Sequence, residues 1–508
     1  MRTSRRRSRG TPYLGLGLVV GMVAAPGRAQ EPIRTTLAEL EIPELDFRPP
    51  AVSEHRLSNG VTVFFLPDST LPLVGFQARF SGGWGRFDRG RYGAGTALPT
   101  LLRRGGTLAR EPDSVSHALE YLALQTTFGG SGESVTSTMN TLTEHLDEAV
   151  ALWTEMLREP RFDASELALW RDRELEAVRR RSDDPGRLAF SEFNRLLYGD
   201  HPVGWEMREE DLSEARLNPE AMHWIHSRIL CPENLLLGVV GDASWDEIER
   251  LLERETADWA SCVEPLPDPP RADVGAPPGV YLIPKAVNQS VVVLAHPVEL
   301  RQGDDPDYFA AQIGNSILGA GGFSSRLLGR VRTEEGLAYG ASSIWTTPRR
   351  YDGLLGATTR TRTDATVEVI EVIQETLRSM TEDPASPEDV RAAVDEWVNG
   401  WVFNFESPSR IVTRMIAYRA SGLSDDWLER YLAGIQAVDA PAVESVYRRY
   451  LRTEELVILV VGDEEALRGP LEALGPVILL SPESAEADPA QDESPPAFPP
   501  LQGLGSSP

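Results

Sequence analysis

The sequence predicts an α+β protein made of two homologous halves, each with an antiparallel sheet and helices. Three observations lead to this prediction: the length of the chain, a strand-and-turn pattern that occurs twice, and a proline-rich segment between the two copies. A chain of 508 residues is too long for one hydrophobic core, so at least two domains are expected. Strands and helices occur in runs and not in strict alternation, which favours antiparallel sheets.

The repeated pattern is a very apolar strand that ends in a Gly-Asp turn. It occurs at Leu235–Asp242 and again at Leu456–Asp463, and each copy leads into a helix-like segment. The two Gly-Asp pairs begin at Gly241 and Gly462, which lie 462 − 241 = 221 residues apart. A unit of this length indicates a duplicated domain and not a solenoid repeat.

Local signals place individual elements within each half. Asn59-Gly60 before an alternating apolar run predicts a turn followed by a strand. Thr141–Glu144 matches a capping box at the start of an amphipathic helix, and Asp163 precedes a long helix that should stop before Asp183. Strands are expected at 61–65, 73–81, 280–283, 289–295, 337–346 and 353–360, and further helices near 306–318 and 325–334.

The proline-rich stretch at 264–279 is interpreted as the linker, because proline is excluded from helix interiors and central strands. The two halves then span residues 50–263 and 280–480. The tail at 481–508 is rich in Pro, Ser, Glu and Asp, lacks periodicity, and is expected to be disordered.

Residues 1–29 have the pattern of a signal peptide. An arginine-rich start precedes the apolar run Tyr13–Ala25, which is too short for a comfortable membrane span, and small residues allow cleavage after Ala29. We therefore expect a protein exported to the periplasm or beyond. No cysteine lies near the cleavage point, so no lipid anchor to the membrane is expected.

The net charge of −27 is unsuited to a nucleic-acid binder, which needs a basic face. The predicted leader carries six arginines, so its removal would take the charge to −27 − 6 = −33. Such a protein repels anionic membranes and can attract cationic peptides. The two cysteines, Cys231 and Cys262, could pair in an exported protein, but Cys231 precedes an apolar strand. Two unpaired structural cysteines are the favoured interpretation.

Several segments, in the same order along the chain, resemble motifs of the M16 (pitrilysin/insulinase-like) peptidase family. The resemblance spans roughly residues 50–480 and implies two halves of the LuxS/MPP-like metallohydrolase fold. The segments that carry it are Gly82–Asp88, Gly93–Thr107, Asp183–Phe190, Tyr198–Pro202, Ile317–Leu327 and Arg332–Tyr339.

Active members of the resembled family bind zinc through His-x-x-Glu-His on one helix and a Glu on the next long helix. Here the two histidine positions are Ala97 and Leu101, the general-base position is Thr100, and the distant carboxylate position is Ala177. Glu174 and Glu176 are close, so a shift of one residue could restore that single ligand but could not restore the two histidines. No zinc is therefore expected in this chain, because two imidazoles and a carboxylate are needed to leave one position for water.

Two other histidine groups could in principle replace the lost site. His117-Ala-Leu-Glu120-Tyr121 imitates the lost motif, but a tyrosine stands at the second histidine position, so a solvated or capping role is favoured. His223 and His226 could touch one ion, but no third ligand is identifiable nearby, and an ordinary helix surface is favoured. On its own the chain is not expected to hydrolyse peptides.

One part of the family's catalytic equipment is retained. In the family an Arg and a Tyr seven residues apart reach across to the zinc site and bind substrate and oxyanion, and Arg332 and Tyr339 match that pair. We expect Arg332 at the end of a helix, a turn at Gly336, and Tyr339 at the start of a strand. In the alternative interpretation Arg332 pairs with Glu335 on the surface and Tyr339 packs in the core.

These features together predict the non-catalytic subunit of an exported heterodimeric zinc peptidase. A zinc-bearing M16 homologue would be the partner, and this chain would supply half of a peptide chamber together with Arg332 and Tyr339. The alternative is a purely structural or peptide-binding protein with no part in proteolysis.

Overall fold

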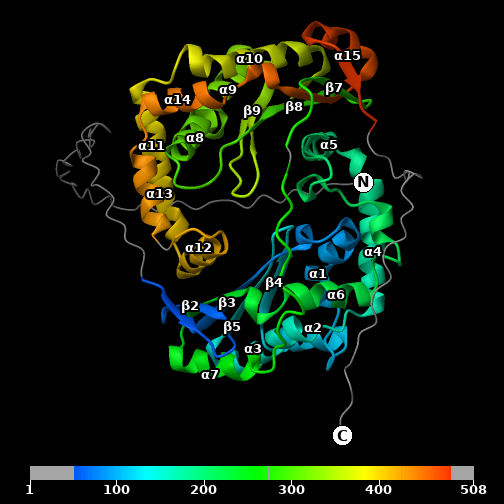
Figure 1. Cartoon of the computed structure of the whole chain (residues 1–508), viewed down its shortest axis with the longest axis vertical. Coiled ribbons are helices and arrows are strands. Elements are labelled where there is room, and N and C mark those ends of the chain that lie inside the picture. The colour runs from blue at the N-terminus through cyan, green and yellow to red at the C-terminus, as the bar shows by residue number, and fades with distance from the viewer. Residues whose placement is uncertain (1–50, 273, 425, 482–508) are drawn as a thin grey trace, which may run out of the picture. The chain divides into compact units, whose positions relative to one another are not determined.

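The computed structural model describes residues 51–481 except 273 and 425 (Figure 1). The predicted signal peptide and all but the first residue of the predicted disordered tail lie outside the described residues. No helix in the described part is long and apolar enough to cross a membrane.

The first half of the described chain ends with helix α7. Its elements are β1 Ser53–Arg56, β2 Thr62–Pro67, β3 Leu73–Ser81, α1 Tyr92–Arg104, α2 Pro112–Tyr121, β4 Gln125–Gly130, β5 Ser134–Leu142, α3 Leu146–Arg158, α4 Ala164–Arg179, α5 Pro185–Tyr198, α6 Pro219–Ile229, β6 Leu235–Gly241 and α7 Trp245–Thr256. Asp163 caps α4 through its side chain as predicted, whereas α3 starts at Leu146 with no side-chain cap, so the capping-box prediction at Thr141 is wrong.

The second half begins with strand β7. Its elements are β7 Gly279–Pro284, β8 Gln289–Val298, α8 Pro306–Asn315, α9 Arg326–Leu328, β9 Ala338–Trp345, β10 Gly353–Arg362, α10 Thr366–Glu382, α11 Pro387–Trp401, α12 Pro408–Ala420, α13 Trp427–Gln436, α14 Ala440–Tyr450, β11 Val457–Gly462, α15 Glu464–Leu471 and β12 Val477–Leu479. All four strands predicted here from the sequence are present within a few residues of their expected ends.

Each half contains one six-stranded sheet, in the orders β1-β2-β6-β3-β5-β4 and β12-β7-β11-β8-β10-β9. Five consecutive positions of the two orders correspond, and β6 and β11 are the two copies of the apolar strand that ends in Gly-Asp. The α+β prediction with two similar halves is therefore confirmed. The sheets are not purely antiparallel, because β2 pairs with β6, and β7 with β11 and β12, in parallel.

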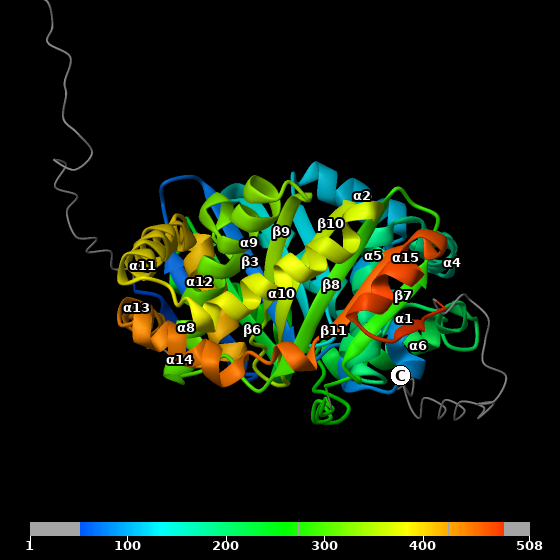
Figure 2. The ribbon, with the colours of Figure 1, turned by 90° about the horizontal axis from the view of Figure 1, so that it is seen from above.

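Each sheet buries one face under its own helices. In β3 the residues alternate strictly, with Val74, Phe76, Ala78 and Phe80 buried in the first core. Helices α1, α3 and α6 contribute to that core (Figure 1). In the second half, α10 lies across β8 and β10 and buries an apolar stripe against them (Figure 2).

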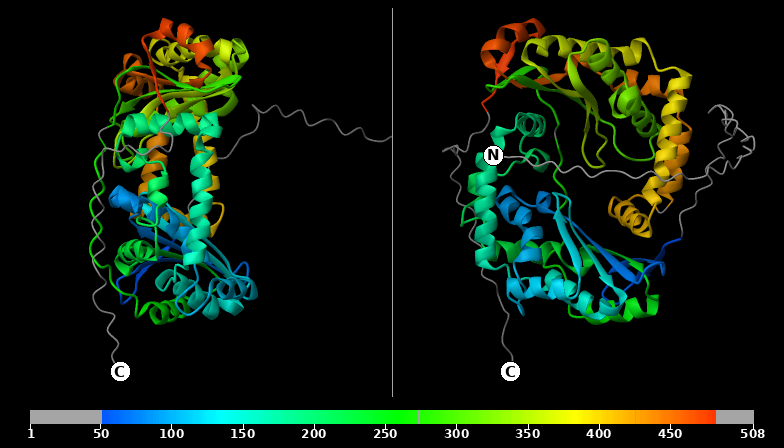
Figure 3. Two further views of the ribbon diagram at one scale, coloured as in Figure 1. Left: turned by 90° about the vertical axis from the view of Figure 1, so that its right-hand side faces the viewer. Right: turned by 180° about the vertical axis from the view of Figure 1, so that it is seen from behind.

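The other face of each sheet is partly covered by a helix from the opposite half. Helix α5 packs Leu188, Phe193 and Leu197 onto β7, β8 and β11, and α12 packs its own apolar face onto β2 and β6 (Figures 1 and 3). The fit beneath α12 is tight, since a Cβ on Gly238 would lie 2.4 Å from the side chain of Val412. The exchanged helices bury apolar surface from both halves in shared clusters, which ties the halves together.

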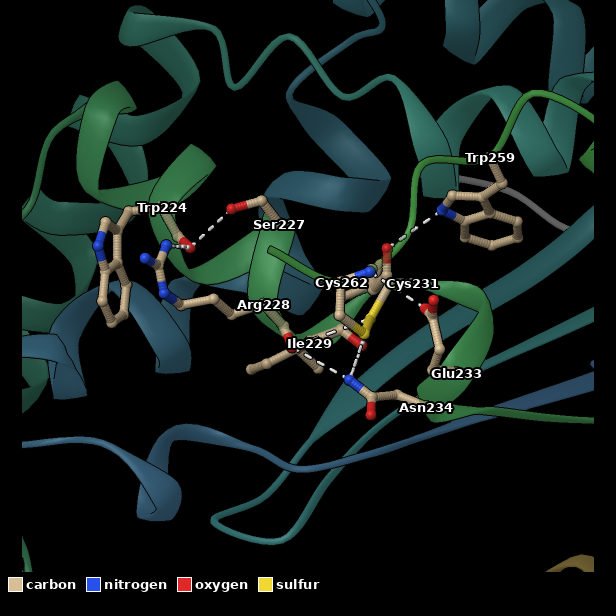
Figure 4. The surroundings of a disulfide bond; sticks show 10 residues. Trp224, Ser227, Arg228, Ile229, Cys231, Glu233, Asn234, Trp259 and Cys262 are labelled. Atoms are coloured by element: carbon tan, nitrogen blue, oxygen red, sulfur yellow. Dashed lines mark hydrogen bonds between the residues drawn. A yellow bond between two sulfur atoms is a disulfide. The ribbon is translucent and has the colours of Figure 1, made fainter. Parts of the chain in front are cut away.

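Cys231 and Cys262 form a disulfide, with their Cα atoms 5.2 Å apart (Figure 4). The prediction of two unpaired cysteines is therefore wrong. The physical reason is the path of the chain after α7: the Trp259 indole donates a hydrogen bond to the Leu230 carbonyl oxygen at 3.1 Å, which returns this segment to the end of α6. The amide of Cys262 also donates to the Glu233 carboxylate at 3.1 Å.

Candidate functional site

Arg332 and Tyr339 lie on two consecutive elements of the second half. Arg332 is in the last turn of a π-helical segment, Gly329–Glu334, and Tyr339 is the second residue of β9. Gly336 between them has a φ of +64°, a conformation that glycine adopts without strain. The buried side chains of Val331 and Leu337 anchor the two elements in the core.

A β-bulge directs Tyr339 away from that core. The pairing of β9 with β10 shifts between Thr359 and Thr361, so two residues of β9 lie opposite one residue of β10. The hydroxyls of Thr359 and Thr361 fix the bulge by donating to the carbonyl oxygens of Gly340 and Leu337, each at 2.7 Å. As a result the Tyr339 side chain is 85% exposed.

Arg332 lies over the ring of Tyr339, with its Cζ atom 4.8 Å from the ring centre. A guanidinium over a tyrosine face is a favourable cation–π contact, which holds both side chains on one surface. The alternative interpretation, with Tyr339 in the core, is contradicted by its exposure. The same interpretation pairs Arg332 with Glu335, but the carboxylate of Glu335 lies 3.6 Å from the guanidinium of Arg330.

Helix α1 holds three of the four positions that the resemblance assigns to the zinc motif. Ala97 and Leu101 are fully buried among aliphatic side chains of the first core, and Thr100 is half-buried. The helix is packed tightly, because a Cβ on Gly95 would lie 2.4 Å from Trp84 and one on Gly130 would lie 2.7 Å from Pro99. The first two positions are therefore apolar packing positions in this protein.

The fourth position, Ala177, lies exposed on α4, which packs against α1. Of the two neighbouring carboxylates, Glu176 forms an exposed ion pair with Arg180 at 2.6 Å. Glu174 is half-buried, and its burial raises the pKa of the carboxyl group above its usual range. Glu174 is thus a partly buried carboxylate on α4, without the imidazoles that would have to accompany it on α1.

The residues at these positions do not fit a zinc ion, since methyl and isobutyl groups have no atom that can bind one. Among the described residues, one group of His, Cys, Asp or Glu side chains, Cys231 with Glu233 and Cys262, has donor atoms within 4.8 Å of one another. The two sulfur atoms of this group are joined in the disulfide and are not thiolate ligands.

The predicted surface position of the α6 histidines is wrong for His226, which is buried. Its Nε2 donates a hydrogen bond to the Leu157 carbonyl oxygen at 2.7 Å, and burial lowers the pKa of the imidazole to about 4. His223 and His226 both contact the ring of Phe162 edge-on, so they serve packing. His117 and Glu120 on α2 are exposed, in line with the solvated role expected for them.

The segment before α1 contains an aromatic cluster that the sequence did not reveal. The rings of Trp84, Tyr92 and Trp205 contact one another, with centres 4.7 to 6.0 Å apart. Arg89 lies beside this cluster and forms an ion pair with the fully buried Asp211 at 3.0 Å. Burial raises the pKa of Tyr92 to about 12. This network fixes the loop that leads into α1.

Residues 216–396 match the protein family described as the peptidase M16 inactive domain. Curated relatives are distant in sequence. An uncharacterized zinc protease of Mycobacterium leprae is 26% identical over 340 residues, which are 66% of this chain and 75% of the relative. A non-peptidase homolog of Helicobacter pylori is 23% identical over 286 residues, which are 55% of this chain and 63% of the relative.

Solved structures share the fold over most of the chain. A peptidase M16 inactive domain from Pseudomonas fluorescens superimposes with a TM-score of 0.71 at 22% identity, covering 82% of this chain and 98% of that protein. A protease from Helicobacter pylori superimposes with a TM-score of 0.70 at 16% identity, covering 82% and 100%. The similarity to M16 peptidases inferred from the motifs is confirmed by the match of residues 216–396 and by the fold that the chain shares with these structures.

Proposed function

We propose that this chain is the non-catalytic subunit of an exported M16-type zinc peptidase. In this proposal a partner chain, a zinc-bearing M16 homologue, carries the metal. This chain contributes half of the peptide chamber and presents Arg332 and Tyr339 to the substrate. The observation that carries the proposal is the exposed Tyr339 with the guanidinium of Arg332 over its ring, on a bulge that points it out of the core.

The pair suits the stabilisation of an oxyanion. A phenol O–H and a guanidinium both donate hydrogen bonds, and neither group has to leave a packed position to do so. When a peptide carbonyl is attacked, its oxygen becomes negative, and fixed donors aimed at that oxygen lower the barrier. An exposed tyrosine that is held in place by a bulge and a cation has the pre-organisation that this role requires.

The need for a partner follows from helix α1. Ala97 and Leu101 are core residues without metal-binding atoms, so within the described residues the positions assigned to the zinc motif offer Arg332 and Tyr339 no metal centre to serve. If the pair acts in catalysis, it acts on a centre in another chain. The aliphatic packing of α1 supports this division, since the positions that the resemblance assigns to the metal ligands on α1 belong to the core of this chain.

The disulfide supports the proposed export to the periplasm. Disulfides persist in oxidising compartments and are rare in the reducing cytosol. Cys231 is buried beside Asn234, whose side-chain amide donates to its sulfur at 3.1 Å. A paired, buried cysteine is consistent with the leader pattern at residues 1–29, which predicts the same compartment.

The second candidate function is a purely structural or peptide-binding role, with no part in proteolysis. The Helicobacter pylori relative is named a non-peptidase homolog, and this name favours the structural or peptide-binding role. The two functions make different predictions for the behaviour of a complex, although both allow a partner chain.

The experiment is a mixing assay with the mature chain and a zinc-bearing M16 protein from the same organism. Peptide hydrolysis is measured for each chain separately and for the mixture, with a chelator-treated mixture as the control. The proposed function requires activity that appears, or rises strongly, only on mixing. A stable complex without a gain in turnover would support the structural role and would contradict the catalytic one.

A further inference from the structure

A second group of arginines, distinct from Arg332, begins with Arg79 on strand β3. Arg79 alternates with the buried residues of β3, so it lies on the face away from the first core. Gln77, two residues earlier on the same face, donates to the Ser409 carbonyl oxygen at the start of α12 at 3.0 Å. Arg79 is half-buried, and its Nε atom is buried with no hydrogen-bond partner among the described residues.

Arg86 belongs to the same end of the sheet. The chain leaves β3 at Gly82, whose amide donates to the Glu133 carbonyl oxygen at the tip of the β4–β5 hairpin at 2.9 Å. A single turn of 3-10 helix then carries Arg86, which donates through Nη1 to the Pro267 carbonyl oxygen at 2.8 Å. Its Nε is likewise buried without a partner in the described part of the chain.

Arg350 reaches this place from the turn between β9 and β10. The ring of its neighbour Tyr351 lies 5.7 Å from the ring of His201. The Nε2 of His201 in turn lies 3.3 Å from the Pro270 carbonyl oxygen, three residues beyond the contact of Arg86. These contacts connect the β9–β10 turn to the proline-rich segment beside Arg86.

The charges of this cluster do not balance. Burial lowers the pKa of both Arg79 and Arg86, and the positive charge of Arg350 lowers both further, while Glu133 opposes the shift in each. Asp268 is the other carboxylate that acts on Arg86. The groups that act on Arg79 and Arg86, together with these two residues, are three guanidinium groups and two carboxylates, an excess among them of 3 − 2 = +1 in a chain whose net charge is −27.

We propose that Arg79, Arg86 and Arg350 form a binding site for one carboxylate of a bound peptide. Guanidinium groups bind carboxylates through paired hydrogen bonds, and such charge-assisted bonds are among the stronger ones in proteins. A single carboxylate carries the charge of −1 that the local excess matches. A phosphate monoester carries about −1.5 to −2 at neutral pH and would overcompensate it.

The carboxylate can come from an acidic side chain or from the C-terminus of the peptide, and both present the same group to the arginines. That the ligand is a peptide rests on the proposed function. Binding by the isolated chain is a separate measurement from turnover in a complex, so the failure of one proposal can be distinguished from the failure of the other.

The test uses the purified mature chain without a partner and three decapeptides labelled with a neutral dye. The peptides differ only at one internal position and at the C-terminus. One peptide has a free C-terminus and an internal Gln, the second has an amidated C-terminus and an internal Glu, and the third has an amide and Gln. Fluorescence anisotropy should show binding at least about tenfold tighter for one or both carboxylate peptides than for the neutral one, and which of them gains identifies the source.

The variant Arg79→Gln should reduce that gain to the level of the neutral peptide, whereas Arg391→Gln on the exposed face of α11 should leave it unchanged. Arg79→Gln should also keep or raise the melting temperature, because it removes a charge whose burial is unfavourable and lowers the pKa of the group. If it unfolds the protein, Arg350→Gln on the exposed turn gives the same test. The proposal would be overturned if all three peptides bound equally or not at all, or if the Arg79 and Arg391 variants had equal effects. It would also be overturned if a fourth peptide, with a phosphoserine at the internal position, bound more tightly than the carboxylate peptides.

Discussion

Reduction of the disulfide should destabilise the first half of the molecule by a predictable amount. The bond closes a loop with a sequence separation of 31 residues between Cys231 and Cys262. The loss of chain entropy in the unfolded state for a loop of this length corresponds to about 3.7 kcal/mol at about 25 °C. Because the exchanged helices tie the halves into one unit of roughly 430 residues, this is a fall in melting temperature of roughly 4 °C.

The assay compares thermal unfolding of the mature protein with and without a phosphine reductant. The matched variant is Cys262→Ser, because Cys262 is half-buried. Replacement of the fully buried Cys231 by serine would instead place a hydroxyl group in the core. The variant should unfold at the temperature of the reduced protein, and reductant should not lower it further. Two results would contradict the presence of a stabilising disulfide. One is the labelling of two thiols when the denatured, unreduced protein is alkylated, and the other is a melting temperature that reductant does not change.

Three further outcomes are expected. The pKa of His226 is about 4 in the folded protein against 6.5 in the unfolded chain, so the contribution of the neutral imidazole to the free energy of unfolding is complete above pH 6.5. That free energy should fall by about 3 kcal/mol as the pH drops to 4, as measured by urea titrations. The variant His226→Gln keeps a donor for the Leu157 carbonyl oxygen and should lack this pH dependence. Asp211→Asn should cost about 3 kcal/mol in the same titrations, because it leaves Arg89 and Arg216 without the buried charge they share. Metal analysis of the purified chain should find no stoichiometric zinc, and one tightly bound zinc per chain would contradict the loss of the motif at Ala97 and Leu101.

The parts of the fold that were predictable are those with strong local signals. The strands β6 and β11 are continuous apolar runs that end in Gly-Asp, so their existence and their equivalence follow from periodicity. Arg332, Gly336 and Tyr339 were placed correctly on helix, turn and strand because each step has its own residue signal. The bulge that exposes Tyr339 has no such signal, since it depends on the pairing of β9 with β10.

The features that escaped prediction all depend on contacts between distant segments. The disulfide forms because α7 and Trp259 return the chain to α6, and no local pattern at Cys262 reports that path. His226 is on an amphipathic helix, and its burial is set by the packing of α3, which supplies the Leu157 carbonyl. Arg79 and Arg350 belong to different halves, and isolated arginines in a sequence rich in arginine carry no signal of a shared site.

The parallel strand pairs have a similar explanation. Short links and runs of strands favour antiparallel neighbours, and most pairs in both sheets follow that rule. The pairs β2–β6 and β7–β11 join strands from the beginning and the end of each half. The long stretch between them allows a parallel crossover, which composition and periodicity cannot distinguish from an antiparallel return.

The most direct test of a catalytic role in trans is the turnover number of the mixed peptidase complex when this chain carries Tyr339→Phe. Tyr121→Phe on α2 is the matched control, because both tyrosines are 85% exposed. We expect Tyr339→Phe to leave folding and association unchanged and to lower kcat by ~100-fold with little change in KM, the size of effect found for the loss of one oxyanion donor. A kcat for Tyr339→Phe equal to that of Tyr121→Phe would contradict the proposed role.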